Sequence, residues 1–289
     1  MPQLQAWLLA VRPKTLGMAV IPVVVGSALA FAQTHVLHVL PALAALLAAM
    51  LIQIGTNLHN DAADHANGVD TANRLGPLRV TAAGLLTAAQ VMQGVKLCFL
   101  LAFCLGVYLV AVGGWVILVA GLLSLAAGAA YSGGKYPISH SPFGEVFVLV
   151  FFGVVAVAGS YYLQTLRVDA SALLAGCVMG LPAAAVLVVN NTRDRESDRL
   201  AGRRTLAVLL GEGFSRAEYA GLLLLPFLIV AASGLGKYLP LLALPWVVFL
   251  LRAFCRVQQP GEFNPLLPLT AQFQLVLGLL LAIGEVCCQ

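Results

Sequence analysis

Long runs of apolar residues dominate the chain and predict membrane-spanning helices. No Asp, Glu, Lys or Arg interrupts residues 15–60, and only the more polar stretch 33–41 divides this run in two. The charge-free run 97–134 is also long enough for two spans, and we expect it to turn at Gly113–Gly114. Since about 20 apolar residues cross about 30 Å of hydrocarbon, each of these runs supplies two spans. Single spans are expected at about 146–166, 170–189, 217–236, 238–251 and 264–284, which makes nine in all.

The composition agrees with this pattern. Hydrophobic residues make up 61% of the 289 residues and charged residues only 10%, whereas about a quarter of a soluble domain is charged. Nine spans use most of the chain, so we expect an all-α polytopic bundle in the lipid bilayer, with residues 1–289 forming one domain. The six cysteines lack the spacing of a metal site and are interpreted as small apolar residues.

The basic residues predict the direction of the bundle. Threading nine spans from a cytoplasmic N-terminus leaves only Arg167 and Lys237 on the outer side. The inner side receives Arg12, Lys14, Arg74, Arg79, Lys96, Lys135, Arg193, Arg195, Arg199, Arg203, Arg204, Arg216, Arg252 and Arg256. The positive-inside rule therefore predicts a cytoplasmic N-terminus and an outer C-terminus. Because topology explains the basic residues, the net charge of +4 does not indicate a nucleic-acid partner, and we expect none.

Two of the apolar runs end in acidic segments. The second span runs into a segment whose polar residues include Asn57, Asn60, Asp61, Asp64 and Asp70. The sixth span runs into a segment where Asn190, Asp194 and Asp198 recur every four residues, which places them on one stripe of a helix. The first segment contains two Asn–Asp pairs at the same spacing. On the expected topology, both segments present carboxylates at one surface.

Gathered carboxylates repel one another unless a cation compensates their charge. Mg²⁺ binds a few carboxylates and completes its coordination with water and phosphate, so we predict that Asp61, Asp64, Asp194 and Asp198 hold Mg²⁺ against a diphosphate. The basic candidates for offsetting the remaining negative charge are Arg79, Lys135 and Arg193. An ordinary solvated loop would explain one such segment, whereas two on the same expected face favour a shared site.

Several short segments together match a known pattern. They are RPKTL at 12–16, NDxxD at 60–64 followed by Asp70 and by RxGPxR at 74–79, YSGGKYP at 131–137, and NNxRDxxxD at 190–198 followed by Thr205 and Leu206. With these motifs the chain resembles the UbiA superfamily of intramembrane aromatic prenyltransferases. The resemblance is closest to the branch that prenylates 1,4-dihydroxy-2-naphthoate on the way to menaquinone.

This resemblance implies an Mg²⁺-dependent enzyme of the inner (cytoplasmic) membrane whose active site faces the cytoplasm. It would transfer a polyprenyl group from polyprenyl diphosphate to 1,4-dihydroxy-2-naphthoate, through an allylic cation in a dry chamber, to give demethylmenaquinol. The resemblance implies catalytic roles for Asp61, Asp64, Asp194, Asp198 and Tyr131. It implies substrate contacts for Asn57, Asn60, Asp70, Arg79, Lys135, Tyr136, Asn190, Asn191, Arg193, Arg12 and Lys14.

Other interpretations of these residues stay open. Tyr131 and Tyr136 are equally interpretable as interfacial anchors of a helix end, and for Arg12 and Lys14 we favour a role in topology over one in holding the acceptor carboxylate.

Two alternatives to the expected function follow from the sequence. Ala62, Lys135 and Glu145 stand where the branch usually has Tyr, Pro and Asp, and the first two lie beside the expected diphosphate and acceptor regions. They leave 4-hydroxybenzoate, homogentisate or a porphyrin as other acceptors, against which the late Asp70 and the GPLR segment at 76–79 argue. A secondary transporter would carry its acids near the middle of the membrane and often in repeated halves, whereas here they gather at helix ends. The pattern predicts neither the prenyl chain length nor the oligomeric state.

Overall fold

The computed structural model describes residues 3–66, 76 and 78–288, and the side chains of 3–63, 76 and 78–288. Within these ranges the chain is helical and contains no β-strand, as the apolar pattern predicted. The elements in chain order are α1 (Gln3–Val11), α2 (Pro13–Thr34), α3 (Val39–Ala66), α4 (Ala88–Ser132), the 3₁₀ turn η1 (Ile138–His140), α5 (Gly144–Leu149), the π-helix η2 (Val150–Val155), α6 (Ala156–Thr165), α7 (Ala170–Leu200), α8 (Leu206–Ser233), the 3₁₀ segment η3 (Leu235–Ala243), α9 (Leu244–Arg256), the 3₁₀ turn η4 (Pro260–Phe263) and α10 (Leu266–Cys287).

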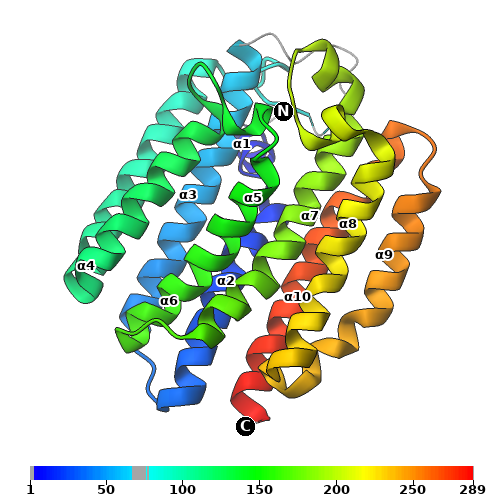
Figure 1. The fold of residues 1–289 in the computed structure, drawn as a ribbon. Helices are drawn as coiled ribbons and strands as arrows, with labels where there is room; N and C mark the ends of the chain where they lie inside the picture. The colour runs from blue at the N-terminus through cyan, green and yellow to red at the C-terminus, as the bar shows by residue number, and fades with distance from the viewer. Residues whose placement is uncertain (1–2, 67–75, 77, 289) are drawn as a thin grey trace.

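Eight stretches of the described chain are long and apolar enough to cross a membrane. One of them is α4, whose 45 residues would extend roughly 68 Å as a straight helix, about twice the thickness of the hydrocarbon. Gly114 breaks this helix with φ 64° and ψ −151°, a conformation that an L side chain disfavours. Its two arms run side by side (Figure 1), so the described chain supplies nine crossings, in agreement with the sequence pattern.

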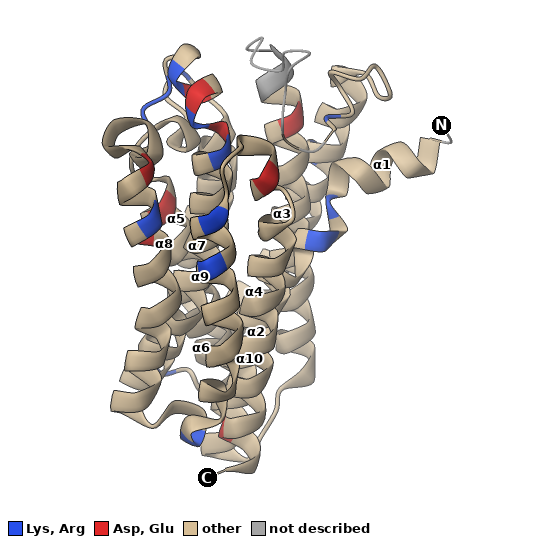
Figure 2. Ribbon diagram, turned by 90° about the vertical axis from the view of Figure 1, so that its right-hand side faces the viewer, with Lys and Arg blue, Asp and Glu red and all other residues tan. Residues whose placement is uncertain are grey.

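The charged residues mark one end of the bundle. Figure 2 shows Lys, Arg, Asp and Glu concentrated where α3 and α7 end, with few at the opposite end. The two chain termini lie at opposite ends (Figure 1), as an odd number of crossings requires. The positive-inside rule assigns the end that is rich in Lys and Arg to the cytoplasm. The side of the membrane that each end faces stays a prediction.

The short helix α1 lies outside the predicted spans. Arg12, with a left-handed φ of 56°, separates it from α2, which begins at Pro13. α1 exposes Leu4 and Leu8 and buries Ala6, and it projects sideways from the charged end of the bundle (Figure 2). Its nine residues are too few to cross the hydrocarbon, which is why a search for long apolar runs does not reveal it.

Glycines allow the π-helix η2 to pack closely against α7. A Cβ atom on Gly153 of η2 would lie 2.3 Å from the carbonyl oxygen of Gly176, and one on Gly180 would lie 2.4 Å from the carbonyl oxygen of Leu149. Only glycine permits backbones to approach this closely, as in many packed membrane helices. The contact fixes η2 against α7, and π-helical turns of this kind often occur at functional sites.

Candidate active site

A large cavity with a volume of about 1600 Å³ lies among α1 to α7, η4 and the start of α10. Its polar lining comes from the ends of α3 and α7 and from the break between α1 and α2. Its apolar lining comes from the middle of the helices and includes Ala48, Ile52, Ile117, Phe151 and Val155. Because a pocket for one small ligand is typically about 300–1,000 Å³, this cavity has room for two substrates that meet between a charged end and an apolar chamber.

The acidic stripe of α7 lies on the cavity wall. Asn190, Asp194 and Asp198 all line the cavity, as their four-residue spacing predicted. α7 is the most thoroughly buried of the membrane-crossing helices and continues to Leu200, so it carries these residues on a rigid support beyond its apolar portion. The structure therefore brings the second acidic motif to the cavity as a unit.

Arg193 neutralises part of this stripe. Its Nε donates to Oδ1 of Asp194 at 2.8 Å and its Nη2 donates to Oδ2 at 2.6 Å, a bidentate pair. Nη2 also donates to Oδ1 of Asn190 at 2.7 Å. The Arg193 side chain is fully buried, so these acceptors must compensate its positive charge in place of water.

A residue from the far end of the chain completes the arrangement around Arg193. Nη1 of Arg193 donates to Oδ1 of Asn264 at 3.1 Å, and Asn264 itself lines the cavity just after η4. The sequence analysis missed Asn264. The available signal was its place in a polar turn between the last two spans, at the same end of the bundle as the acidic motifs.

Asp198 has an arginine partner of its own. Nη1 of Arg203 lies 3.1 Å from Oδ1 of Asp198, and the backbone N–H of Arg203 donates to the carbonyl oxygen of Asp198 at 2.9 Å. Both residues line the cavity, and their side chains are largely buried. Each carboxylate of the α7 motif is thus paired with a guanidinium at the cavity wall, a role for Arg203 that its sequence position did not reveal.

Asp61 on α3 is held differently. Its Oδ2 accepts from the backbone N–H of Val80 at 3.0 Å, and its Oδ1 accepts from the N–H of Thr81 at 3.0 Å and from the Thr81 hydroxyl. Asp61 is buried and does not line the large cavity. The carboxylate therefore anchors the segment that leads from α3 to α4, and its predicted role as a metal ligand stays a prediction.

This anchored segment carries Arg79 to the cavity. Nη1 of Arg79 donates to the carbonyl oxygen of Asn60 at 2.5 Å and lies 3.5 Å from its Oδ1. Arg79 and Asn60 both line the cavity, and Arg79 is buried. The structure thus places a guanidinium from the first motif in the same cavity as the second motif.

The break between α1 and α2 supplies further polar lining. Nδ2 of Asn57 donates to the carbonyl oxygen of Val11 at 3.0 Å, which ties the end of α1 to α3. Asn57, Arg12 and Lys14 all line the cavity. Asn57 therefore has a structural contact besides its predicted contact with substrate.

The two tyrosines of the segment 131–137 lie in different places. Tyr131 lines the cavity and packs against the apolar cluster that contains Met18 and Val148. Tyr136 is 83% exposed, and the ammonium of Lys135 lies 5.5 Å from the centre of its ring. Neither Lys135 nor Tyr136 lines the cavity, so the substrate contacts predicted for them stay predictions without support from this geometry.

Asn191 has a buried acidic neighbour. Its Nδ2 donates to Oε1 of Glu145 at 2.7 Å, and Glu145 is buried where α5 begins. Asn191 also lines the cavity. Glu145, noted in the sequence only as a departure from the family pattern, thus orients an amide of the second motif.

Part of the first motif lies beyond the described portion of the chain. Asp64 belongs to α3 one turn after Asn60, but its side chain is not among those described, and Asp70 lies outside the described residues. Among the described side chains, no three of His, Cys, Asp or Glu gather closely enough to hold a metal ion alone. The carboxylates of Asp194 and Asp198 still fit Mg²⁺, which binds proteins through one or two carboxylates together with the phosphates of its substrate.

Known proteins share this sequence and architecture. The family model of the UbiA prenyltransferase family matches residues 19–264. The 1,4-dihydroxy-2-naphthoate octaprenyltransferase of Escherichia coli (strain K12) is 38% identical, over 97% of this chain and 94% of that protein. The human UbiA prenyltransferase domain-containing protein 1 is 31% identical, over 96% of this chain and 82% of that protein.

A solved structure shares the fold. The structure of a UbiA homolog from Archaeoglobus fulgidus bound to DMAPP and Mg²⁺ matches with a TM-score of 0.68 at 16% identity, over 94% of this chain and 97% of that one. Because the family model covers most of the chain and relatives of similar length exceed 30% identity, this protein belongs to the UbiA prenyltransferase family.

Proposed function

We propose that this protein transfers a polyprenyl group from a polyprenyl diphosphate to 1,4-dihydroxy-2-naphthoate and forms demethylmenaquinol, a precursor of menaquinone. The observation that carries the proposal is the placement of Asp194 and Asp198 on the wall of a cavity of about 1600 Å³ whose deeper lining is apolar. The identity of the acceptor is supported by bacterial relatives that bear the name of this activity, at 34–38% identity over nearly the whole chain.

The charged end of the cavity suits the diphosphate. Asp194 and Asp198 would hold Mg²⁺, with Asp64 of the first motif as a further expected ligand, and when bound the ion would offset the negative charge of the diphosphate. Arg79, Arg193 and Arg203 line the same region, and guanidinium groups bind phosphate oxygens through paired hydrogen bonds. These arginines would stabilise the charge that develops on the leaving diphosphate as the allylic C–O bond breaks.

The apolar part of the cavity suits the prenyl chain and the cation. Phe147, Phe151 and Phe152 line it together with Tyr131, and an aromatic face stabilises a desolvated cation by about 2 kcal/mol. These side chains also exclude water that would otherwise capture the cation. A ring carbon of the acceptor then forms the new C–C bond, and the acceptor carboxyl group leaves as carbon dioxide.

Arg12 and Lys14 give the cavity a second cationic region. Both line it, at the break between α1 and α2, although the sequence alone favoured a role in topology for them. A carboxylate on the acceptor would pair with these two side chains while its ring extends into the apolar chamber. By the positive-inside rule, this charged end faces the cytoplasm, and we place the protein in the inner membrane.

The decisive experiment offers acceptors side by side. Purified protein in detergent is incubated with a radiolabelled polyprenyl diphosphate and Mg²⁺, and with either 1,4-dihydroxy-2-naphthoate or 4-hydroxybenzoate. We expect lipid-soluble product with the naphthoate alone, and none after chelation of the divalent ion. Product from 4-hydroxybenzoate alone would move the proposal to another acceptor, and product that persists after chelation would contradict the role of Mg²⁺.

A further inference from the structure

The outer face of α9 carries two arginines that the catalytic cavity does not use. Arg252 and Arg256 are four residues apart, so they lie on one face of the helix, one turn from each other. Both are exposed, and both belong to an apolar stretch that is able to cross the membrane, Leu235–Arg256. Neither residue lines the catalytic cavity.

The opposite face of α9 packs into the bundle. Val247, Leu250 and Phe254 are buried, and the Phe254 ring stacks on that of Tyr219 at 4.2 Å. This packing fixes the helix and leaves the arginine face turned toward the bilayer. The two guanidinium groups therefore have a rigid support and a defined spacing.

Neither arginine has a partner within the described part of the chain. The ion pairs of that part join other residues, and no hydrogen bond from Arg252 or Arg256 accompanies them. Arg252 and Arg256 follow the expected span 238–251, so they belong to the charged end of α9 (Figure 2), where the polar headgroups of the bilayer lie. At this depth the two unpaired guanidinium groups are within reach of a lipid headgroup phosphate.

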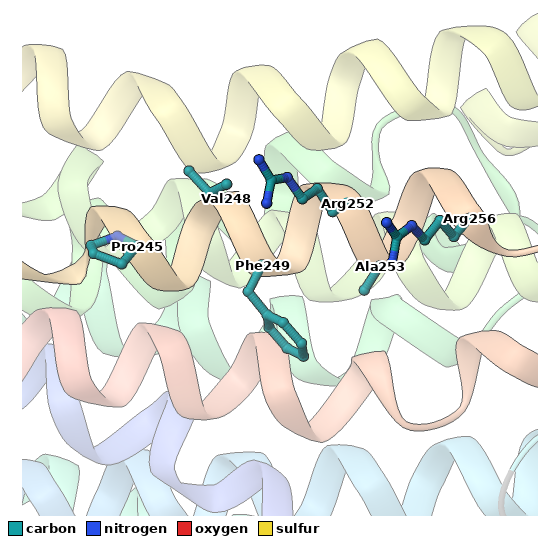
Figure 3. Close-up of a pocket in the computed structure, with 6 residues that line it drawn as sticks. All are labelled: Pro245, Val248, Phe249, Arg252, Ala253 and Arg256. Atoms are coloured by element: carbon teal, nitrogen blue, oxygen red, sulfur yellow. The ribbon is translucent and has the colours of Figure 1, made fainter.

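The surface beside these arginines is hollowed and apolar. Together with Arg252 and Arg256, the residues Pro245, Val248 and Phe249 line a groove with a volume of about 320 Å³. Figure 3 shows the apolar side chains toward the start of α9 and Arg256 at its end, with Arg252 between them. The groove is therefore apolar toward the interior of the membrane and cationic toward the charged end of the bundle.

We propose that this groove binds an anionic phospholipid, with the headgroup phosphate between Arg252 and Arg256 and an acyl chain along Val248 and Phe249. Arginine suits this role because its planar guanidinium donates two hydrogen bonds to one phosphate. Within the described residues neither guanidinium is paired with a carboxylate, so both positive charges are available, which favours a lipid of net negative charge over a zwitterionic one. The groove lies on the outer face of α9, so its occupant would not compete with substrate for the catalytic cavity.

The test measures lipid binding by the purified, delipidated protein. Native mass spectrometry would count the phosphatidylglycerol and phosphatidylcholine molecules retained during titration with each lipid. We expect a preference of about tenfold or more for phosphatidylglycerol, and a loss of about tenfold in its affinity in the double variant Arg252→Gln, Arg256→Gln, since the charged hydrogen bonds to the headgroup phosphate are removed.

Control variants distinguish lipid binding in the groove from a general attraction of anionic lipid to positive charge. Lys96→Gln combined with Arg199→Gln removes two exposed positive charges elsewhere and should leave binding unchanged. Val248→Trp fills the groove but keeps both arginines, and it should weaken binding of the lipid. Equal binding by wild type and the arginine variant, or an equal loss in the control variant, would overturn the proposal. So would displacement of the lipid by millimolar inorganic phosphate, which would identify a site for free phosphate.

Discussion

The two acidic motifs look alike in the sequence, yet the structure holds Asp61 of the first in a different way from Asp194 and Asp198 of the second. On α7, Asp194 and Asp198 lie on the cavity wall, and each is paired with an arginine. On α3, Asp61 turns both oxygens to the backbone of Val80 and Thr81 and does not line the cavity. The α7 carboxylates are thus placed where a ligand could reach them, whereas the Asp61 carboxylate holds the segment that follows α3.

The helices that carry the motifs differ in the same sense. Most of the apolar window of α7 is buried, whereas most of that of α3 is not. α7 thus supplies a well-packed wall of the cavity. α3 is less buried, and Asp61 near its end fixes the segment that leads to α4 through its bonds to Val80 and Thr81. We expect substitutions in the two motifs to fail in different ways.

The largest effect is expected on α7. Asp194→Ala and Asp198→Ala should each lower turnover by about 100-fold or more, since each removes a carboxylate that faces the diphosphate end of the cavity. Membrane insertion should be unaffected. Turnover is measured with radiolabelled prenyl diphosphate over a range of Mg²⁺ concentrations, and the midpoint should move to higher Mg²⁺ wherever residual activity allows a titration. Full turnover in either variant would remove the α7 motif from the active site.

The matching change on α3 is Asp61→Asn. The amide keeps one acceptor oxygen but turns an NH₂ group toward a backbone N–H, so the anchor of Val80 and Thr81 is weakened. We expect the free energy of unfolding to fall by about 1–3 kcal/mol, and turnover to fall as Arg79 loses its support. Thermal unfolding in detergent and the Mg²⁺ titration are measured together. An unchanged melting temperature with a raised Mg²⁺ midpoint would instead make Asp61 a metal ligand like Asp194.

Much of the fold follows from local pattern. Charge-free runs, the turn at Gly113–Gly114 and the four-residue spacing of Asn190, Asp194 and Asp198 all depend on neighbours in the chain, and the structure agrees with each. Helix periodicity was sufficient to place the α7 stripe because the helix continues without a break to Leu200. The sequence therefore predicted the second motif better than the first.

The rest depends on contacts between distant segments. The partners of Asp61 come 19 and 20 residues later, after the end of its helix, so no helical spacing indicates the direction of its side chain. Asn264 bonds to Arg193, which lies 71 residues earlier in the chain. The packing of η2 against Gly176 and Gly180 requires close contact between the backbones of two helices. A single sequence carries no periodic signal for such pairs.

A glycine substitution tests whether α7 is the more rigid wall. Gly180→Ala would place a Cβ atom 2.4 Å from the carbonyl oxygen of Leu149, and backbone cannot move aside cheaply. Gly55→Ala on α3 would meet the ring of Phe99 at 2.8 Å and the Cβ atom of Cys98 at 3.3 Å, and the Phe99 ring can rotate. We expect Gly180→Ala to cost about 1–3 kcal/mol of stability and Gly55→Ala less, with thermal unfolding in detergent as the measure. The reverse order would contradict the view of α7 as the fixed half of the site.

The smallest effect is expected where the α7 motif meets the end of the chain. Asn264→Ala removes one acceptor from the buried Arg193 guanidinium but leaves its bidentate pair with Asp194 intact. A hydrogen bond to a charged group contributes about 1.5–3 kcal/mol, and the remaining partners of Arg193 should limit the loss to the lower end of that range, or about tenfold in kcat/KM for the prenyl diphosphate. Gln258→Ala, an exposed position just before η4, is the control and should leave kcat/KM unchanged. Equal kinetics in both variants would show that Asp194 and Asn190 orient Arg193 without help from the turn between η4 and α10.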